Sequence, residues 1–170
     1  KHKIDFFSTP FGIKSAKLLE QIKVPLMKIA SGEITNHELI TYLSKMKIPL
    51  LVSTGMTTIS EIAQIVELMK NAKSNFVLLH CVSSYPTLTK DANLSTIPYL
   101  KNMFDVPIGF SDHTTGIEVS LAAVALGACV IEKHFTLDKN MEGPDQKLSL
   151  DPSEFSNLSK GIHRIEQALG

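Results

Sequence analysis

Short apolar runs alternate with longer amphipathic stretches along the whole chain. The stretches carry apolar residues at helical spacing, and Ile62, Ile65 and Met69, for example, share one face of such a helix. Strand-like and helix-like segments alternate six times, which predicts parallel strands joined by right-handed crossovers. The apolar runs are residues 4–8, 26–30, 49–53, 76–81, 106–111 and 129–135.

Two folds share this alternation, the open doubly wound sheet and the (β/α)8 TIM barrel. A nucleotide-binding open sheet carries a glycine-rich turn after its first strand, and the sequence has neither G-x-G-x-x-G nor a P-loop lysine motif. Polar residues follow every apolar run instead, as at the mouth of a barrel. We therefore expect a (β/α)8 barrel. These strand-end residues are Ser8, Thr9, Ser31, Glu33, Ser53, Thr54, Ser83, Ser84, Tyr85, Asp112, His113 and His134.

The predicted barrel is incomplete. The chain has 170 residues, whereas the fold usually takes about 250. We expect about six βα units, corresponding to strands 3–8, with the first two units absent from residues 1–170. The chain begins with lysine directly before an apolar run, which suggests a piece of a longer protein.

His113 and His134 follow consecutive predicted strands at equivalent positions. Adjacent strands lie about 4.8 Å apart, so two imidazoles there can share one metal ion, with water and substrate oxygens as its other ligands. The alternative is two polar residues that hydrogen-bond at the mouth. Side-chain alternation places Glu132 on the face of His134 and turns Lys133 toward the helices, where an ion pair is the simplest role. Asp112 turns away likewise, and we expect it to cap the next helix at Thr114–Thr115.

Lys28 lies inside an apolar run, two residues before its end. A buried lysine is costly unless it meets an anion, so we expect it to bind phosphate or carboxylate, to form a Schiff base, or to extend to the rim. Ser31, Ser53 and Thr54 offer hydroxyls near helix starts, which suit phosphate. The long polar loop 136–152 is expected to bring Asp145 to the substrate.

Composition narrows the choice of partners and compartment. Lysine plus arginine equals aspartate plus glutamate, 17 each, and aromatic residues make up 6% of the chain. This balance argues against nucleic acid and against an anionic membrane as partners. No apolar stretch reaches the roughly 20 residues of a membrane span, and no signal peptide is visible. Cys81 and Cys129 lie in apolar runs and are predicted to be buried free thiols, so we expect a cytoplasmic protein.

At its strand ends the sequence resembles the sialic acid synthase family, the enzymes that make N-acetylneuraminate and related nonulosonates. Six collinear motifs carry the resemblance and cover nearly the whole chain. They are FFSTPF at 6–11, KIASGE at 28–33, LLVSTGM at 50–56, LLHCVSSYPT at 78–87, GFSDHTTG at 109–116 and IEKHFTLDKNMEGPDQKLSLDP at 131–152.

The resemblance implies a (β/α)8 barrel that condenses phosphoenolpyruvate with an N-acylated hexosamine, such as N-acetylmannosamine, and releases phosphate. It implies that His113 and His134 hold Mn²⁺ or Mg²⁺, which polarises the sugar aldehyde. Two further sets of positions match the family. Those that hold the phosphate and carboxylate of phosphoenolpyruvate are Lys28, Thr9, Ser31, Ser53 and Ser83, and those on the sugar side are Tyr85, Glu132 and Asp145. The family often has asparagine where Ser83 stands.

The resemblance also implies parts that residues 1–170 do not contain. These are a catalytic glutamate and a lysine from the first two βα units, and a C-terminal antifreeze-like domain that brings an arginine to the partner subunit of a homodimer. We therefore expect residues 1–170 alone to be a poor catalyst. Two other readings stay open: a Schiff-base aldolase that uses Lys28 on the same fold, and a non-catalytic module that binds sugar phosphates.

Overall fold

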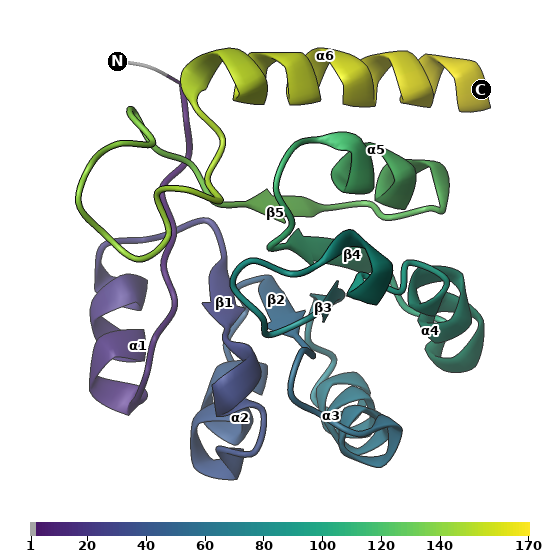
Figure 1. Cartoon of the computed structure of the whole chain (residues 1–170). Helices are drawn as coiled ribbons and strands as arrows, with labels where there is room; N and C mark the ends of the chain where they lie inside the picture. The colour runs from purple at the N-terminus through teal and green to yellow at the C-terminus, as the bar shows by residue number, and fades with distance from the viewer. Residues whose placement is uncertain (1–2) are drawn as a thin grey trace. The chain divides into compact units, whose positions relative to one another are not determined.

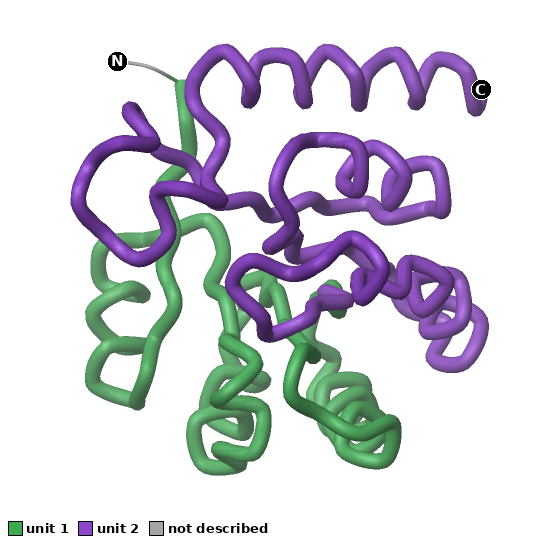
Figure 2. The backbone as a smooth tube through the Cα atoms, viewed as in Figure 1, with its two compact units in different colours: residues 1–78 green, residues 79–170 purple. Residues whose placement is uncertain are grey.

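The computed structural model describes residues 3–170, in which strands and helices alternate (Figure 1). The chain forms two compact units, unit 1 up to Leu78 and unit 2 from Leu79 on (Figure 2). The elements are α1 (Ile13–Gln21), β1 (Met27–Ile29), η1 (Ser31–Glu33), α2 (His37–Ser44), β2 (Leu50–Ser53), α3 (Ile59–Asn71), β3 (Phe76–Cys81), η2 (Thr89–Asp91), α4 (Thr96–Phe104), β4 (Ile108–Asp112), α5 (Glu118–Ala125), β5 (Ile131–Lys133) and α6 (Pro152–Leu169).

The strands follow the order β1-β2-β3-β4-β5, and β3 runs across the boundary between the units. β1 pairs with β2 in parallel, and β4 pairs with β5 in parallel. Each strand is followed by a helix, as a (β/α)8 barrel requires. The predicted fold class is confirmed as an incomplete barrel of this type. None of the described helices has the length and apolar character needed to cross a membrane.

In unit 1, β1 and β2 are almost wholly apolar because helices cover them. Ile29 and Val52 are fully buried, and so are Ile40 of α2 and Met69 of α3. α3 begins where Thr58 caps it: the Thr58 hydroxyl accepts from the backbone N–H of Glu61, and the Glu61 carboxylate accepts from the backbone N–H of Thr58. This capping box satisfies two backbone donors that a helix start would leave unpaired.

The predicted first strand at residues 4–8 is wrong. Within the described residues this segment forms one isolated bridge, between Ser8 and Met27, while Ile4 and Phe6 are exposed. The run is apolar like the buried strands, but only Ser8 forms a backbone bridge, and a strand needs such pairing along several residues. An apolar pattern records a preference for burial, and it does not supply the neighbouring backbone that a strand needs.

In unit 2, β4 lies between close neighbours at Gly109. A Cβ there would lie 2.8 Å from the Val130 carbonyl oxygen and 2.6 Å from a methyl carbon of Leu79, so only glycine fits without displacing its surroundings. Cys81 is buried as predicted, whereas Cys129 is exposed. The prediction for Cys129 fails because β5 is shorter than its apolar run and begins at Ile131. Cys129 lies in the segment before the strand, where its backbone N–H donates to the Ile108 carbonyl at 2.8 Å while its side chain is exposed.

The last helix, α6, begins at Pro152 with Asp151 as its N-cap and packs against α5 (Figure 1). The Asp151 side chain accepts from the backbone N–H of Glu154, and the Glu154 carboxylate accepts in return from the backbone N–H of Asp151. Lys139 also donates to Glu154, at 2.6 Å. The hydrogen bond from Lys139 and that from Asp151 hold the pKa of Glu154 below its ordinary value.

Because the pKa of Glu154 is lower in the folded chain than its ordinary value of 4.5, ionised Glu154 stabilises the fold above that value. We expect Glu154→Gln to lower the free energy of unfolding at neutral pH by about 0.5 kcal/mol, the size typical of partly exposed ion pairs. The difference from wild type should disappear as the pH falls below 4.5 and through the folded pKa. Urea unfolding followed by circular dichroism tests this, with Glu142→Gln in an exposed loop as control. A difference that grows on acidification would contradict it.

Candidate active site at the strand ends

The strand ends of unit 2 bring His113, His134 and Tyr85 together. The imidazole centroids of His113 and His134 lie 5.4 Å apart. The phenol ring of Tyr85 lies 4.1 Å from the first ring and 5.8 Å from the second, measured between centroids. Three residues that are distant in sequence thus form one cluster, and this confirms that the two histidines following β4 and β5 are neighbours.

The parallel register of β4 and β5 explains the pairing of the two histidines. Ser111 lies opposite Glu132, and Asp112 lies opposite Lys133. The next residues along each chain are His113 and His134, which therefore occupy equivalent positions just beyond the paired strands. Alternation also puts Ser111 and Glu132 on the histidine face, where the Ser111 hydroxyl donates to the Glu132 carboxylate at 2.5 Å.

His113 is buried and held in one orientation by its own hydrogen bond. Its Nδ1–H donates to the backbone carbonyl of Val82 at 2.8 Å. In a neutral imidazole this leaves Nε2 as the nitrogen with a lone pair, and Nε2 lies 3.5 Å from the Ser111 hydroxyl. Metal-binding histidines commonly donate their second nitrogen to a carbonyl or carboxylate in this way.

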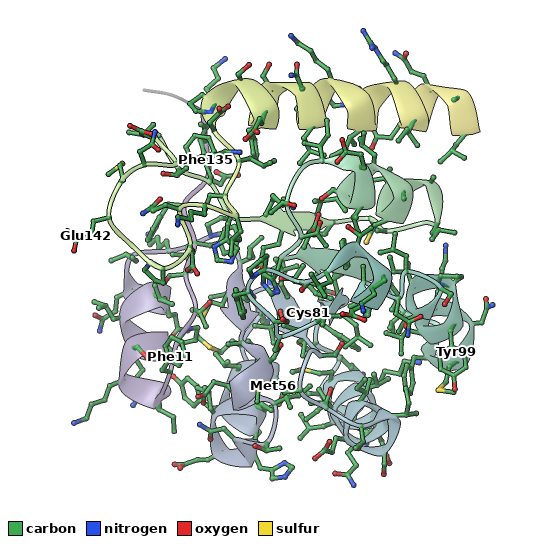
Figure 3. The ribbon with its side chains drawn as sticks, viewed as in Figure 1. Phe11, Met56, Cys81, Tyr99, Phe135 and Glu142 are labelled. Carbon is green, nitrogen blue, oxygen red and sulfur yellow. The ribbon has the colours of Figure 1, made fainter. Side chains whose placement is uncertain are left out.

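His134 is more accessible, with 30% of its side chain exposed, and its Nδ1 lies 3.7 Å from a carboxylate oxygen of Asp145. Asp145 belongs to the loop 136–152, so this loop approaches the cluster as the sequence predicted. Glu142, in another part of the loop, is exposed, and so is Phe135, which directly precedes the loop (Figure 3).

Tyr85 completes the cluster as a neutral hydrogen-bond donor. Burial raises the pKa of its phenol, and the nearby acidic groups Cys81, Glu132 and Asp145 raise it further. The phenol therefore keeps its proton at neutral pH. Ser83, two residues earlier, is exposed in the loop after β3.

The cluster fits a divalent cation that takes two ligands from the protein. His113 and His134 supply two nitrogens, and the nearby oxygens of Glu132 and Ser111 suit water or substrate hydroxyls. Across residues 3–170, no group of three or more histidine, cysteine, aspartate or glutamate side chains forms a candidate metal site. Such a cation would complete its coordination with water and substrate oxygens.

Unit 1 carries a second set of predicted site residues. The Ser31 hydroxyl accepts from the backbone N–H of Gly55, at 3.0 Å, and so connects the segment after β1 with the segment after β2. The Ser53 hydroxyl is buried and finds no hydrogen-bond partner among the described residues. A buried polar atom without a partner is costly and often marks a place where a ligand binds. Thr9 and Lys28 are half-buried, and the backbone N–H of Lys28 donates to the Ser8 carbonyl at 3.2 Å.

Two features of the site were not predicted as functional. One is Ser111, although its alternation with His113 marks it as a residue that can reach Glu132. The carbonyl of Val82, which orients His113, left no trace in the sequence because any residue supplies a carbonyl. His80 is a buried histidine apart from this cluster: its Nε2 lies 2.8 Å from the Ala92 carbonyl, and burial lowers its pKa.

Comparison with known proteins shows what the chain is similar to. The model of the NeuB family matches residues 1–170. An N,N'-diacetyllegionaminic acid synthase of Campylobacter jejuni is 47% identical over 173 residues, which cover 100% of this chain and 52% of that protein. An N-acetylneuraminate-9-phosphate synthase of Mus musculus is 39% identical over 171 residues, with 99% and 48% covered.

Among solved structures, an N-acetylneuraminic acid synthetase from Leptospira borgpetersenii, in complex with citrate, superposes with a TM-score of 0.95 at 44% identity. The match covers 98% of this chain and 59% of that one. The chain spans about half the length of the curated relatives described above.

The geometry at His113 predicts its tautomer. Because Nδ1–H donates to the Val82 carbonyl, we expect the neutral ring to carry its proton on Nδ1, the reverse of the usual preference in free histidine. Side-chain nitrogen correlation spectra of isotope-labelled histidine, recorded without metal at about pH 9, where imidazoles are neutral, measure this directly. His163 on the exposed surface of α6 serves as the reference. A proton on Nε2 of His113 would contradict the arrangement.

Proposed function

Because the chain belongs to the NeuB family, we propose that the complete protein is a nonulosonate synthase that condenses phosphoenolpyruvate with an N-acylated hexosamine and releases phosphate. The observation that carries this proposal is the cluster of His113 and His134, with ring centroids 5.4 Å apart, beside the acidic side chain of Glu132. The relatives support it, since those named above are synthases of nonulosonates.

We assign the metal ligands to His113 and His134. Mn²⁺ or Mg²⁺ bound there would act as a Lewis acid that polarises the aldehyde of the sugar. The protein prepares this site by fixing one ring: the hydrogen bond from Nδ1 of His113 to Val82 keeps the lone pair on Nε2. Asp145, 3.7 Å from Nδ1 of His134, places a carboxylate beside the second ring.

We assign the sugar side to Glu132, Tyr85 and Asp145. Glu132 accepts a hydrogen bond from Ser111, and its carboxylate has further lone pairs to accept hydroxyl protons of the sugar. Tyr85 carries its phenol proton at neutral pH, as tyrosine ordinarily does, and its raised pKa acts in the same direction, so it can donate to a sugar oxygen. Together they fix the aldehyde carbon for attack, and such positioning lowers the barrier of a two-substrate reaction.

We assign the anionic groups of phosphoenolpyruvate to unit 1. The buried hydroxyl of Ser53, which has no partner among residues 3–170, can donate to a phosphate oxygen, and Lys28 supplies positive charge. Ser31 follows β1 and Thr9 follows the segment 4–8, and Ser83 is the further position that the family resemblance assigns to this substrate. In the proposed reaction, carbon 3 of phosphoenolpyruvate bonds to the aldehyde carbon, water adds at carbon 2, and the bond from carbon 2 to the phosphate oxygen breaks.

The sugar itself is not specified by these residues. The relatives named above differ in product, one a legionaminic acid and the other a 9-phosphate of N-acetylneuraminate. We propose a cytoplasmic homodimer that uses one N-acylated hexosamine of this group, with or without a 6-phosphate.

Phosphate release by the complete protein tests the reaction. We expect release only when phosphoenolpyruvate and one sugar from a panel of N-acetylmannosamine, its 6-phosphate and diacetamido-dideoxy hexoses are both present. Chelation should abolish activity and Mn²⁺ should restore it. A covalent adduct on Lys28 after borohydride treatment with a carbonyl substrate would instead indicate a Schiff-base aldolase. Ligand binding without phosphate release under all these conditions would indicate a non-catalytic module.

His113→Ala tests the metal ligands. Lewis-acid polarisation contributes several kcal/mol, and 1.36 kcal/mol is tenfold in rate, so we expect kcat to fall at least about 100-fold and Mn²⁺ binding to be lost. The fold should survive, because His113 lies beyond the paired part of β4. His163→Ala, which removes an exposed histidine of α6, is the matched control. A folded His113→Ala protein with full metal content and full rate would exclude His113 as a ligand.

A further inference from the structure

A buried ion pair lies directly beside the two histidines in sequence. Lys133 Nζ and Asp112 Oδ2 are 2.9 Å apart, and their side chains are 1% and 0% exposed. Asp112 and Lys133 are the last pair in the β4–β5 register, so the next residue along each chain is a histidine of the site. The sequence predicted that both side chains would turn away from the site, but it did not predict that they meet.

Every strong polar group of this pair is satisfied by nearby protein atoms. Asp112 Oδ1 accepts from the backbone N–H of Thr114 at 2.8 Å and from its hydroxyl at 2.7 Å, while Oδ2 accepts from the Ser120 hydroxyl at 2.5 Å. Lys133 Nζ also donates to the Thr114 carbonyl at 2.6 Å. The pair thus connects β4, β5, the turn after β4 and helix α5.

Stability alone does not explain such a pair. Removing two charges from water costs several kcal/mol, and well-packed apolar residues in their place are often as stable or more so. A role in conformational specificity is the better explanation, because a buried pair breaks if either partner moves. The group whose position it restricts most directly is His113: Asp112 precedes it, and Thr114, which follows it, is bound through its N–H by Asp112 and through its carbonyl by Lys133.

We propose that Asp112 and Lys133 are positioning residues that set the separation and orientation of the two metal-binding imidazoles. The pair fixes the backbone on both sides of His113 and ties it to the residue before His134. It touches neither substrate nor metal and acts through the histidines. This inference rests on the proposed function, which identifies the ligand as a metal ion. The arrangement of the two imidazoles, which the inference explains, is present without any ligand.

The double variant Asp112→Asn/Lys133→Met tests the proposal, because it removes both charges together and leaves no single buried charge unpaired. On the metal-free complete protein, we expect the backbone amide spectrum to stay folded. We also expect the nuclear Overhauser effect between the rings of His113 and His134 to weaken at least about threefold. The dissociation constant of Mn²⁺, measured from the electron paramagnetic resonance signal of free Mn²⁺, should rise about 10-fold to 100-fold. Losses of this size are typical when a residue that orients a metal ligand is replaced.

The matched control is Lys139→Met/Glu154→Gln, which removes a partly exposed ion pair of the same unit, 2.6 Å between nitrogen and oxygen. This variant should keep the ring contact and the Mn²⁺ affinity. If the Asp112/Lys133 variant also keeps both while folded, the pair has no positioning role and the proposal is wrong.

If the double variant does not fold, Ser120→Ala provides the decision. This variant deletes one hydrogen bond to Asp112 and keeps both charges. The proposal then requires that the Mn²⁺ affinity or the nuclear Overhauser effect between the two rings fall at least about threefold. Unchanged values of both would overturn it. A wild-type protein that binds no Mn²⁺ would overturn the proposed metal-dependent function instead. The ring contact in metal-free protein would still decide the positioning role.

Discussion

The parallel pairing of β4 with β5 is the interaction on which the site of unit 2 depends. A slip of one residue would exchange the faces of neighbouring side chains, so that Lys133 would replace His134 beside His113, and Glu132 would lose Ser111. Strong local constraints oppose such a slip. Gly109 admits the neighbouring backbone at Val130 where no larger residue fits, and Asp112 meets Lys133 only in the observed register.

The two sets of site residues differ in whether their polar groups have hydrogen-bond partners within the protein. In unit 2 the carboxylate of Asp112, the ring of His113 and the amine of Lys133 have protein partners, so these groups are held before any ligand arrives. In unit 1 the buried Ser53 hydroxyl has none in the described chain. The first arrangement keeps its groups in place, and the second leaves a buried hydroxyl that can take a hydrogen-bond partner from outside the described residues.

Membership of the NeuB family explains why these features occur at strand ends. In a (β/α)8 barrel the paired strands supply stability, whereas the residues just beyond them are free to carry chemistry. The loop 136–152 illustrates this division: it brings Asp145 to His134, yet it exposes Met141 and Glu142.

The sequence by itself determined the alternation of elements and the faces on which Glu132, Lys133 and His134 lie. These follow from periods of 2 and 3.6 residues, which depend on near neighbours in the chain. The resemblance of its six motifs to the sialic acid synthase family added the expected roles of the site residues. Sequence alone could not reject the strand at 4–8 or predict that Cys129 is exposed, because both depend on which distant segments come to lie beside these residues.

Only the tertiary structure decided which distant groups meet. Three contacts of the site join segments that are about 20 to 50 residues apart in the chain. They are the ion pair of Asp112 with Lys133, the hydrogen bond from His113 to the Val82 carbonyl, and the packing of Tyr85 beside both imidazoles. Such contacts are set by the register of paired strands and by the path of loops. A one-residue change in either would alter them while leaving the local pattern of apolar and polar residues almost the same.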